Sequence, residues 1–139
     1  MIIRCGNAQD RANLLRLRPQ ASAFLPDGAG SYLMIAEDGG NLLAFAAVFR
    51  RMIPAPVERE EAFINVIEVL DEANYRRGIA SSLVRDILAL ERARNTYQVR
   101  AYCDIGNVAS HRLWASNGFG IAPVQIGENI VGSYVTCVL

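Results

Sequence analysis

The order of apolar and polar positions along the chain switches between the two-residue period of strands and the 3.6-residue period of helices. Short runs rich in branched and aromatic residues, bounded by turn residues, predict seven strands. These strands are expected at residues 1–4, 31–36, 42–49, 62–70, 97–103, 121–126 and 130–138. Segments with apolar residues three or four positions apart predict three helices. These helices are expected at residues 7–18, 78–94 and 107–117.

Cap and turn residues indicate where several of these elements begin and end. Asn7 is typical of a helix cap, and Pro19 is expected to end that helix near Arg18. The sequence Asp-Gly-Gly-Asn at 38–41 predicts a hairpin between the two strands around it. Gly118 is typical of the left-handed residue that closes a helix.

The strand at 62–70, the helix at 78–94 and the strand at 97–103 form a strand–helix–strand unit. Its two strands are expected to be parallel neighbours with a right-handed crossover, whereas the hairpins elsewhere are antiparallel. This order predicts an α/β (α+β mixed) fold with a mixed, mostly antiparallel sheet of six to seven strands and helices on both faces. A length of 139 residues without a repeat or linker indicates one domain over 1–139.

The composition excludes several kinds of chemistry. All 14 basic residues are Arg, so no Lys is available for a phosphate-binding loop or a Schiff base. The 14 acidic residues balance them, which argues against a nucleic-acid partner. One His and three scattered Cys give no metal-ligand spacing, so no metal is expected. Sparse Cys, no visible signal peptide and no membrane-spanning run predict a cytoplasmic protein.

The passage from the strand at 62–70 into the helix at 78–94 is the most informative for chemistry. A helix opening has unpaired N–H groups and the positive end of the helix dipole, so it favours an anion such as phosphate. Gly78 lets the backbone approach a ligand closely, and Arg76 and Arg77 add positive charge. The alternative is an ordinary strand-to-helix turn with two solvated arginines.

Two motifs resemble those of one protein family. Residues 75–80, Tyr-Arg-Arg-Gly-Ile-Ala, resemble the Arg/Gln-x-x-Gly-x-Gly/Ala signature of the GNAT superfamily of acetyl-CoA-dependent N-acyltransferases. Asn107, Leu113-Trp114 and Asn117-Gly118-Phe119 resemble its later Asn-x-x-Ala-x-x-Leu-Tyr-x-x-x-Gly-Phe segment. The order of elements agrees over essentially the whole chain. The resemblance implies an N-acetyltransferase that transfers acetyl from acetyl-CoA directly to an amine of a small molecule or peptide. It makes a homodimer plausible, because small members often pair through late strands.

The resemblance also implies how acetyl-CoA binds. In such proteins the sheet splays between the strand at 62–70 and its parallel neighbour, and the thioester enters the gap. Asn107 would contact the pantetheine side of the cofactor and also cap its helix. The main chain at the strand end would pair with the pantetheine arm through Ile67, Val69 and Leu70. The backbone of the helix opening would hold the pyrophosphate through Arg76, Arg77, Gly78, Ile79, Ala80 and Ser81.

The chain departs from the family pattern at two positions. Tyr75 stands where the signature prefers Arg or Gln, and Trp114 stands where the family often has a Tyr that serves as general acid. An indole N–H is a hydrogen-bond donor but not a usable acid, so Trp114 is expected to be a core aromatic. This departure leaves an alternative open: a catalytically impaired GNAT-fold protein that binds acyl-CoA or a partner protein.

Glu68 and Tyr102 are the candidate catalytic residues. Glu68 lies in an apolar strand near the expected gap, where it would act as a base unless its side chain points outward. Tyr102, on the next strand, would replace the missing acid or be a half-buried strand residue. Cys103 is expected to be a packed thiol, and His111 an exposed helix residue.

The acceptor substrate is expected to lie over residues 20–30 and 50–61. Arg50 and Arg51 would attract an anionic substrate, or they only mark a charged strand end. Glu60 and Glu61 are expected to be solvated. Another phosphate ligand, such as a nucleotide, is the remaining alternative for the helix opening.

Overall fold

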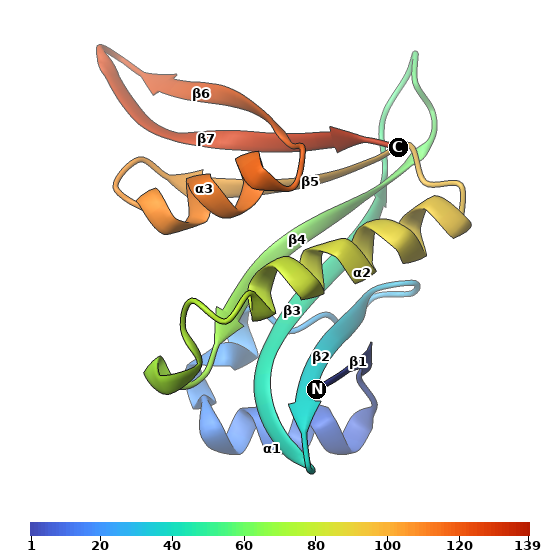
Figure 1. The fold of residues 1–139 in the computed structure, drawn as a ribbon. Coiled ribbons are helices and arrows are strands. Elements are labelled where there is room, and N and C mark those ends of the chain that lie inside the picture. The colour runs from blue at the N-terminus through green and yellow to red at the C-terminus, as the bar shows by residue number, and fades with distance from the viewer.

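The computed structural model describes residues 1–139, and Figure 1 shows its elements. It contains the predicted seven strands and three helices. It also contains two short 3-10 helices, labelled η. The elements are β1 (Ile2–Cys5), α1 (Ala8–Leu17), η1 (Pro19–Ala23), β2 (Tyr32–Asp38), β3 (Asn41–Met52), β4 (Glu60–Val69), η2 (Glu72–Asn74), α2 (Ile79–Ala93), β5 (Gln98–Asp104), α3 (Val108–Ser116), β6 (Gly120–Ile126) and β7 (Asn129–Val138).

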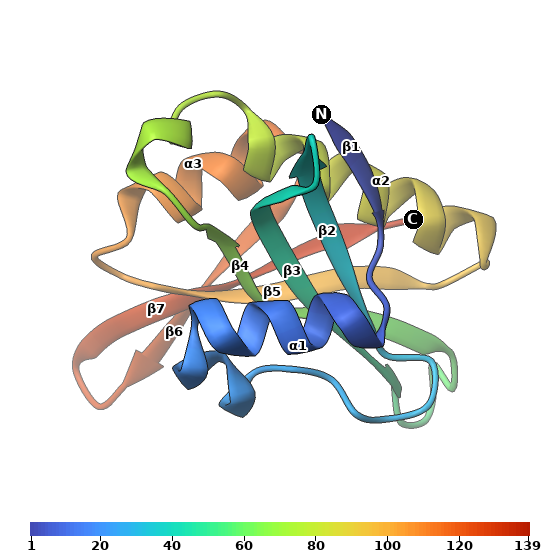
Figure 2. The same cartoon turned by 90° about the horizontal axis from the view of Figure 1, so that it is seen from below.

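The seven strands form one sheet in the order β1-β2-β3-β4-β5-β7-β6, and only β4 and β5 are parallel. This mixed, mostly antiparallel sheet confirms the predicted fold class. α2 and α3 cover one face, whereas α1 and η1 cover the β2–β3 part of the other face (Figure 2). None of the helices combines the length and the apolar character that a membrane crossing requires.

A reciprocal cap begins α1. The Asn7 side chain accepts a hydrogen bond from the Asp10 N–H (3.0 Å), and the Asp10 carboxylate accepts one from the Asn7 N–H (2.8 Å). This capping box satisfies two main-chain donors that a first helical turn leaves unpaired. α1 ends at Leu17, and Pro19 opens η1, because proline cannot continue a helix without a clash. The predicted start and end of this helix are confirmed.

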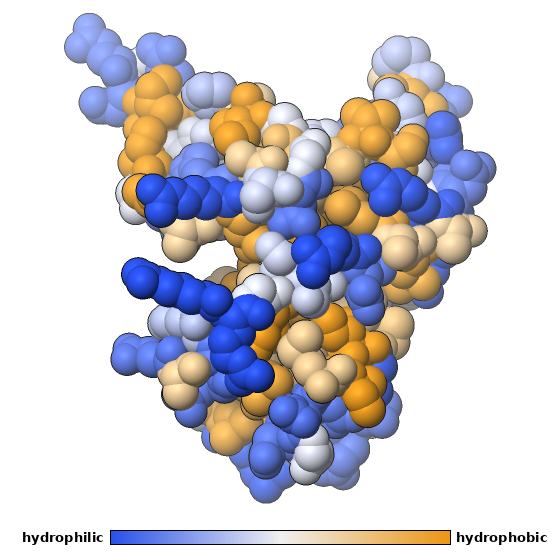
Figure 3. All heavy atoms as spheres, viewed as in Figure 1, coloured by the Kyte–Doolittle hydropathy of each residue, from blue (hydrophilic) through white to orange (hydrophobic).

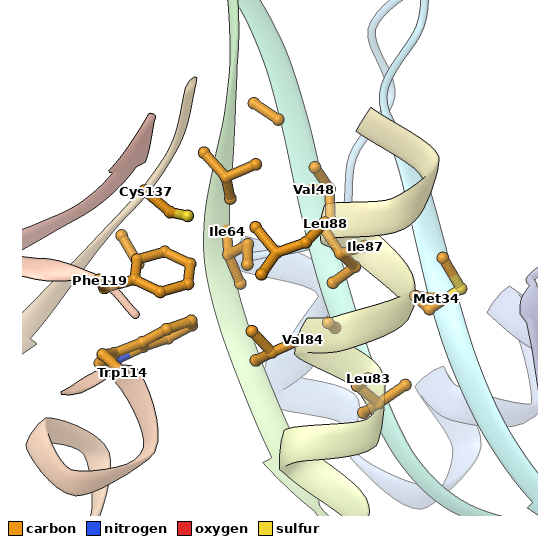
Figure 4. Close-up of a cluster of buried hydrophobic side chains, with 14 of the residues drawn as sticks. Met34, Val48, Ile64, Leu83, Val84, Ile87, Leu88, Trp114, Phe119 and Cys137 are labelled. Atoms are coloured by element: carbon orange, nitrogen blue, oxygen red, sulfur yellow. The ribbon is translucent and has the colours of Figure 1, made fainter. Parts of the chain in front are cut away.

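The larger of two apolar cores lies between the sheet and the layer of α2 and α3 (Figure 4). Trp114 is only 2% exposed, and its ring centroid lies 5.0 Å from that of Phe119. Its burial confirms that Trp114 is a core aromatic. A fully buried Leu, Ile or Val stabilises such a core by about 1.5–3 kcal/mol. The core side chains labelled in Figure 4 are Met34, Val48, Ile64, Leu83, Val84, Ile87, Leu88, Trp114, Phe119 and Cys137.

β4 and β5 separate halfway along their length, so the sheet opens there (Figure 1). Their parallel pairing ends at Ile64 and Ala101, although β4 continues to Val69 and β5 continues to Asp104. The second half of β4 therefore has a main-chain edge without a strand partner. This is the opening that the family resemblance implies.

A β-bulge in β4 lies where the two strands separate. Ile64 pairs with Val48 of β3 and Val66 pairs with the neighbouring Ala47, which leaves Asn65 without a partner. The extra residue reverses the alternation of side chains along the strand. Ile64 packs into the larger core, whereas Val66 packs against the smaller core beneath α1.

Candidate functional site

A cavity of about 860 Å³ lies at the opening between β4 and β5. The space-filling view shows the surface hollowed at the left, between α3 and the loop before α2, with hydrophilic side chains on both sides (Figure 3). Three segments line it: the end of β4, the loop and first turn of α2, and the first turns of α3. The lining residues are Ile67, Glu68, Val69, Asn74, Tyr75, Arg76, Gly78, Ile79, Ala80, Ser81, Asn107, Val108, Ala109, Ser110, Arg112 and Leu113.

The N-terminus of α2 presents its main chain to this cavity. Gly78 caps the helix with φ +75°, no side chain accepts from the first turn, and that turn contains no acidic residue. The first backbone hydrogen bond runs from the Ser82 N–H to the Gly78 carbonyl (3.0 Å), so the N–H groups before it remain free. A Cβ at position 78 would meet no atom within 4 Å, so the positive φ explains the glycine. These donors suit an anion.

The two arginines before α2 have different positions. Arg76 lines the cavity and adopts a left-handed backbone conformation with φ +63°. Arg77 does not line it, and its guanidinium donates to the Asn74 side chain. Only Arg76 therefore brings a guanidinium to the cavity from this loop.

The end of β4 forms the floor of the cavity. Ile67 and Val69 line it, but Leu70 does not. The Leu70 N–H donates to the Leu43 carbonyl of β3 (2.9 Å), and its own carbonyl accepts from Arg18 (2.7 Å). Because successive N–H groups of a strand point to opposite edges, the Val69 N–H points toward the opening.

Glu68 lines the cavity and is held by a residue 50 positions earlier in the chain. The Arg18 Nε donates to Glu68 Oε1 (2.8 Å), and both side chains are about one-third exposed, at 32% and 37%. The second carboxylate oxygen accepts no hydrogen bond from the protein. Glu68 thus has a fixed position and one oxygen free for a substrate or a water molecule.

Asn107 lines the opposite wall of the cavity. Its side-chain oxygen accepts from the Ser110 N–H (3.0 Å), so the expected capping role is confirmed. The Ser110 hydroxyl, also in the lining, accepts from the indole N–H of Trp114 (3.0 Å). The Trp114 donor is therefore used inside α3.

The structure does not bring Tyr102 to the cavity that contains Glu68. Tyr102 lies on the sheet face opposite α2 and α3, where its ring makes an edge contact with Tyr134 at 5.4 Å. It packs over Gly132, where a Cβ would overlap the Tyr102 ring and lie 2.5 Å from the Cys103 carbonyl oxygen. The residue is 39% exposed.

Two sequence expectations about titratable residues are wrong. Glu61 is only 3% exposed, because donors from neighbouring strands surround a carboxylate that was expected to be solvated. His111 is half-buried, with Nδ1 3.0 Å from the Cys103 Sγ and 2.9 Å from the Asn107 carbonyl oxygen. Cys103 is 3% exposed, which confirms a packed thiol. No local sequence signal indicates contacts between separate elements.

Comparisons with known proteins agree with this fold. The chain is similar over its full length to a ribosomal-protein-alanine N-acetyltransferase from Brucella melitensis, with 18% identity, 100% coverage of both chains and a TM-score of 0.73. It is similar to a GCN5-related N-acetyltransferase from Kribbella flavida, with 19% identity, coverage of 99% and 97%, and a TM-score of 0.75. A GNAT family acetyltransferase from Elizabethkingia anophelis with acetyl-CoA bound gives 15% identity, coverage of 99% and 97%, and a TM-score of 0.72.

These structural similarities show the fold. No curated protein matches the chain by sequence. The sequence profile of the Acetyltransferase (GNAT) family, however, matches residues 7–119, which include both motifs and every residue that lines the cavity. The chain therefore belongs to the GNAT acetyltransferase family.

Proposed function

We propose that the protein is an acetyl-CoA-dependent N-acetyltransferase that transfers an acetyl group directly to an amine of a small molecule or peptide. The observation that carries this proposal is the opening between β4 and β5, with a helix N-terminus at one end and a free strand edge along its floor. Family membership supports the same reaction class.

The cavity residues fit acetyl-CoA. A volume of about 860 Å³ lies within the usual range for ligand pockets, about 300–1,000 Å³. The free amides from Gly78 to Ser81 would hold the pyrophosphate, and Arg76 would add charge. The free edge of β4 at Ile67 and Val69 would pair with the amides of the pantetheine arm, with Asn107 on the opposite wall.

The proposed transfer assigns a task to two groups of β4. Acetyl-CoA supplies a thioester carbonyl that the amine nitrogen attacks; a C–N bond forms, the C–S bond breaks, the amine loses a proton and the sulfur gains one. The Val69 N–H would donate to the carbonyl oxygen, where negative charge develops. Oε2 of Glu68 would accept the amine proton, directly or through water. Tyr102 lies outside the cavity. To protonate the leaving sulfur, its hydroxyl would have to approach from the other face of the sheet.

A thermal-shift titration tests the cofactor. Acetyl-CoA and CoA are expected to raise the melting temperature in a dose-dependent way, because a ligand that binds only the folded state stabilises it. The absence of a shift at millimolar acetyl-CoA would overturn the proposal. Competition with ATP distinguishes a general nucleotide site, at which ATP would displace CoA.

The position of Trp114 supports a second candidate function, acyl-CoA binding without catalysis. Its buried indole occupies the place where the family often has a Tyr that serves as general acid, and the indole N–H already donates a hydrogen bond to the Ser110 hydroxyl. A panel of amines with detection of released CoA thiol separates the two functions. CoA binding without turnover of any amine, and without an effect of Glu68→Gln on CoA binding or thiol release, would favour the binding protein.

A further inference from the structure

A second cavity, of about 550 Å³, lies on the opposite sheet face from α2 and α3 and shares no lining residue with the first. Arg51 of β3, Glu61 of β4, Arg100 of β5 and Tyr134 of β7 contribute side chains to it. Its lining residues Arg51, Met52 and Tyr134 are exposed, so the cavity is open to solvent.

A buried carboxylate organises the cations of this cavity. Oε1 of Glu61 accepts from Arg51 Nε (2.7 Å) and Arg100 Nη2 (2.9 Å), and Oε2 accepts from the Gln98 side chain (2.7 Å). Burial raises the pKa of Glu61, but hydrogen bonds from Gln98, Arg100 and Arg51 outweigh burial and lower it below its ordinary value. Glu61 is therefore a fixed negative charge at neutral pH.

The cavity keeps a surplus of positive charge and of donors. Two guanidinium groups face one carboxylate, which leaves one positive charge uncompensated. Neither Nη group of Arg51 donates to the protein, and Nη1 of Arg100 is also free. The side chain of Arg51 is 51% exposed and that of Arg100 is 26% exposed, so a ligand can reach them.

Aromatic rings hold both guanidinium groups in place. Arg51 lies 4.9 Å and Arg100 lies 5.5 Å from the ring centroid of Phe63, and Arg100 lies 4.9 Å from that of Tyr134. Cation–π contacts of this kind restrict the side chains before any ligand binds. An anion would then bind without a large loss of side-chain freedom.

The position of the cavity relates it to the reacting centre. Glu61 lies seven residues before Glu68, the candidate base, and this length of β4, which includes the bulge, spans about 20 Å. If acetyl-CoA fills the α2–α3 side of the opening, the acceptor amine approaches from the face that carries this cavity. The second cavity therefore lies about 20 Å from an amine within reach of Glu68.

We propose that the Arg51–Arg100 cavity binds a carboxylate of the acceptor substrate, about 20 Å from the amine that is acetylated. This inference rests on the proposed function and adds a substrate class to it: amines with a carboxylate at the far end. A guanidinium with free N–H groups matches a carboxylate in charge and in planar geometry.

The test compares hexa-alanine with hexa-alanine amide, because six extended residues place the amine and the terminal group about 20 Å apart. NMR titrations use the full chain, with and without saturating CoA. Hexa-alanine is expected to bind about tenfold more tightly than the amide and to shift signals of Arg51, Gln98 and Arg100. Equal binding of the two peptides, or no binding of either, would overturn the carboxylate site.

Matched variants locate the effect. Arg51→Gln is expected to abolish the preference for hexa-alanine, and the half-exposed position of Arg51 permits folding. Arg59→Gln is the control, because Arg59 contacts Tyr97 and the Asn95 carbonyl outside the cavity. A preference that survives Arg51→Gln would overturn the inference. Loss of CoA binding alone would instead overturn the proposed function, since the peptide titration without CoA still measures the carboxylate site.

Discussion

Arg18, the residue after α1, holds Glu68 at the edge of the cavity although the two are 50 positions apart. One guanidinium makes two contacts with the end of β4: Nε donates to Glu68 Oε1 at 2.8 Å, and Nη2 donates to the Leu70 carbonyl at 2.7 Å. The side chain and the main chain of the strand end are thus fixed by one residue. The candidate base consequently depends on the junction between α1 and η1.

Glu68→Gln tests the base directly. Gln keeps the shape and can still accept from Arg18, but it cannot take a proton from an amine at neutral pH. We expect kcat to fall by about 10²–10⁴-fold, the usual range for a lost general base, with an unchanged dissociation constant for CoA. Steady-state kinetics and a CoA titration measure the two quantities. Glu72→Gln, in the exposed η2, is the matched control, and an unchanged kcat in Glu68→Gln would refute the role.

Arg18→Gln tests positioning rather than proton transfer. It removes the guanidinium that fixes Glu68, so we expect kcat to fall, but by less than in Glu68→Gln. The ion pair is one-third exposed, so the free energy of unfolding should change by only about 0–1 kcal/mol. Kinetics and urea unfolding separate these effects. If Arg18→Gln lowers stability strongly and leaves kcat intact, the residue has a structural role alone.

Gly78→Ala tests the helix opening as an anion site. The residue has φ +75°, where an alanine costs about 1–2 kcal/mol. Gly39→Ala is a close control, because Gly39 also has a positive φ (+55°) and open space around its Cβ position, but it lies in the β2–β3 hairpin. We expect both variants to lose similar stability and only Gly78→Ala to weaken CoA binding. Equal CoA affinity in both variants would contradict the anion site.

Strong local signals explain why so much of the fold could be predicted. The apolar stripe of α2, the capping residue Asn7 and the hairpin turn at 38–41 each specify an element without reference to the rest of the chain. The two family motifs then place the helix opening and Asn107 beside one cavity.

Contacts between distant elements could not be predicted in this way. The bulge at Asn65 arises from the register between β3 and β4, and no nearby turn residue indicates it. Glu61 is buried only because Arg51 of β3 and Gln98 and Arg100 of β5 surround its carboxylate. A charged residue beside other charges is typical of a solvated turn, so the local pattern favoured the wrong environment.

Glu91→Gln tests a buried ion pair that connects α2 to the sheet. Glu91 is 0% exposed; its carboxylate lies 3.1 Å from Arg50 Nε and accepts from the Thr96 hydroxyl at 3.3 Å. Removing its charge leaves the largely buried Arg50 with Glu60, at 2.8 Å, as its one carboxylate partner. We expect the free energy of unfolding in urea to fall by about 3 kcal/mol. Asp86→Asn, exposed on the same helix, should change it by no more than about 0.5 kcal/mol. Equal effects in the two variants would show that the buried pair contributes little.

The ion pair between Arg4 and Asp10 predicts an acid-dependent loss of stability. Arg4 donates to both oxygens of Asp10, at 2.6 and 2.9 Å. These hydrogen bonds, together with the one from the Asn7 N–H, lower the pKa of Asp10 below its ordinary value. A lowered pKa in the folded state means that the unfolded chain binds the proton first as the pH falls. The stabilisation is therefore complete above the ordinary carboxyl pKa and is lost as the pH falls through the folded value.

Asp10→Asn removes this linkage. We expect the variant to be less stable than the wild type at neutral pH, and the difference to shrink between about pH 5 and about pH 2. Urea unfolding across this range measures both curves. Arg4→Gln removes the cation instead of the acid and should likewise make the free energy of unfolding less dependent on pH. A difference between wild type and Asp10→Asn that stays constant down to about pH 2 would show that the carboxylate charge does not contribute.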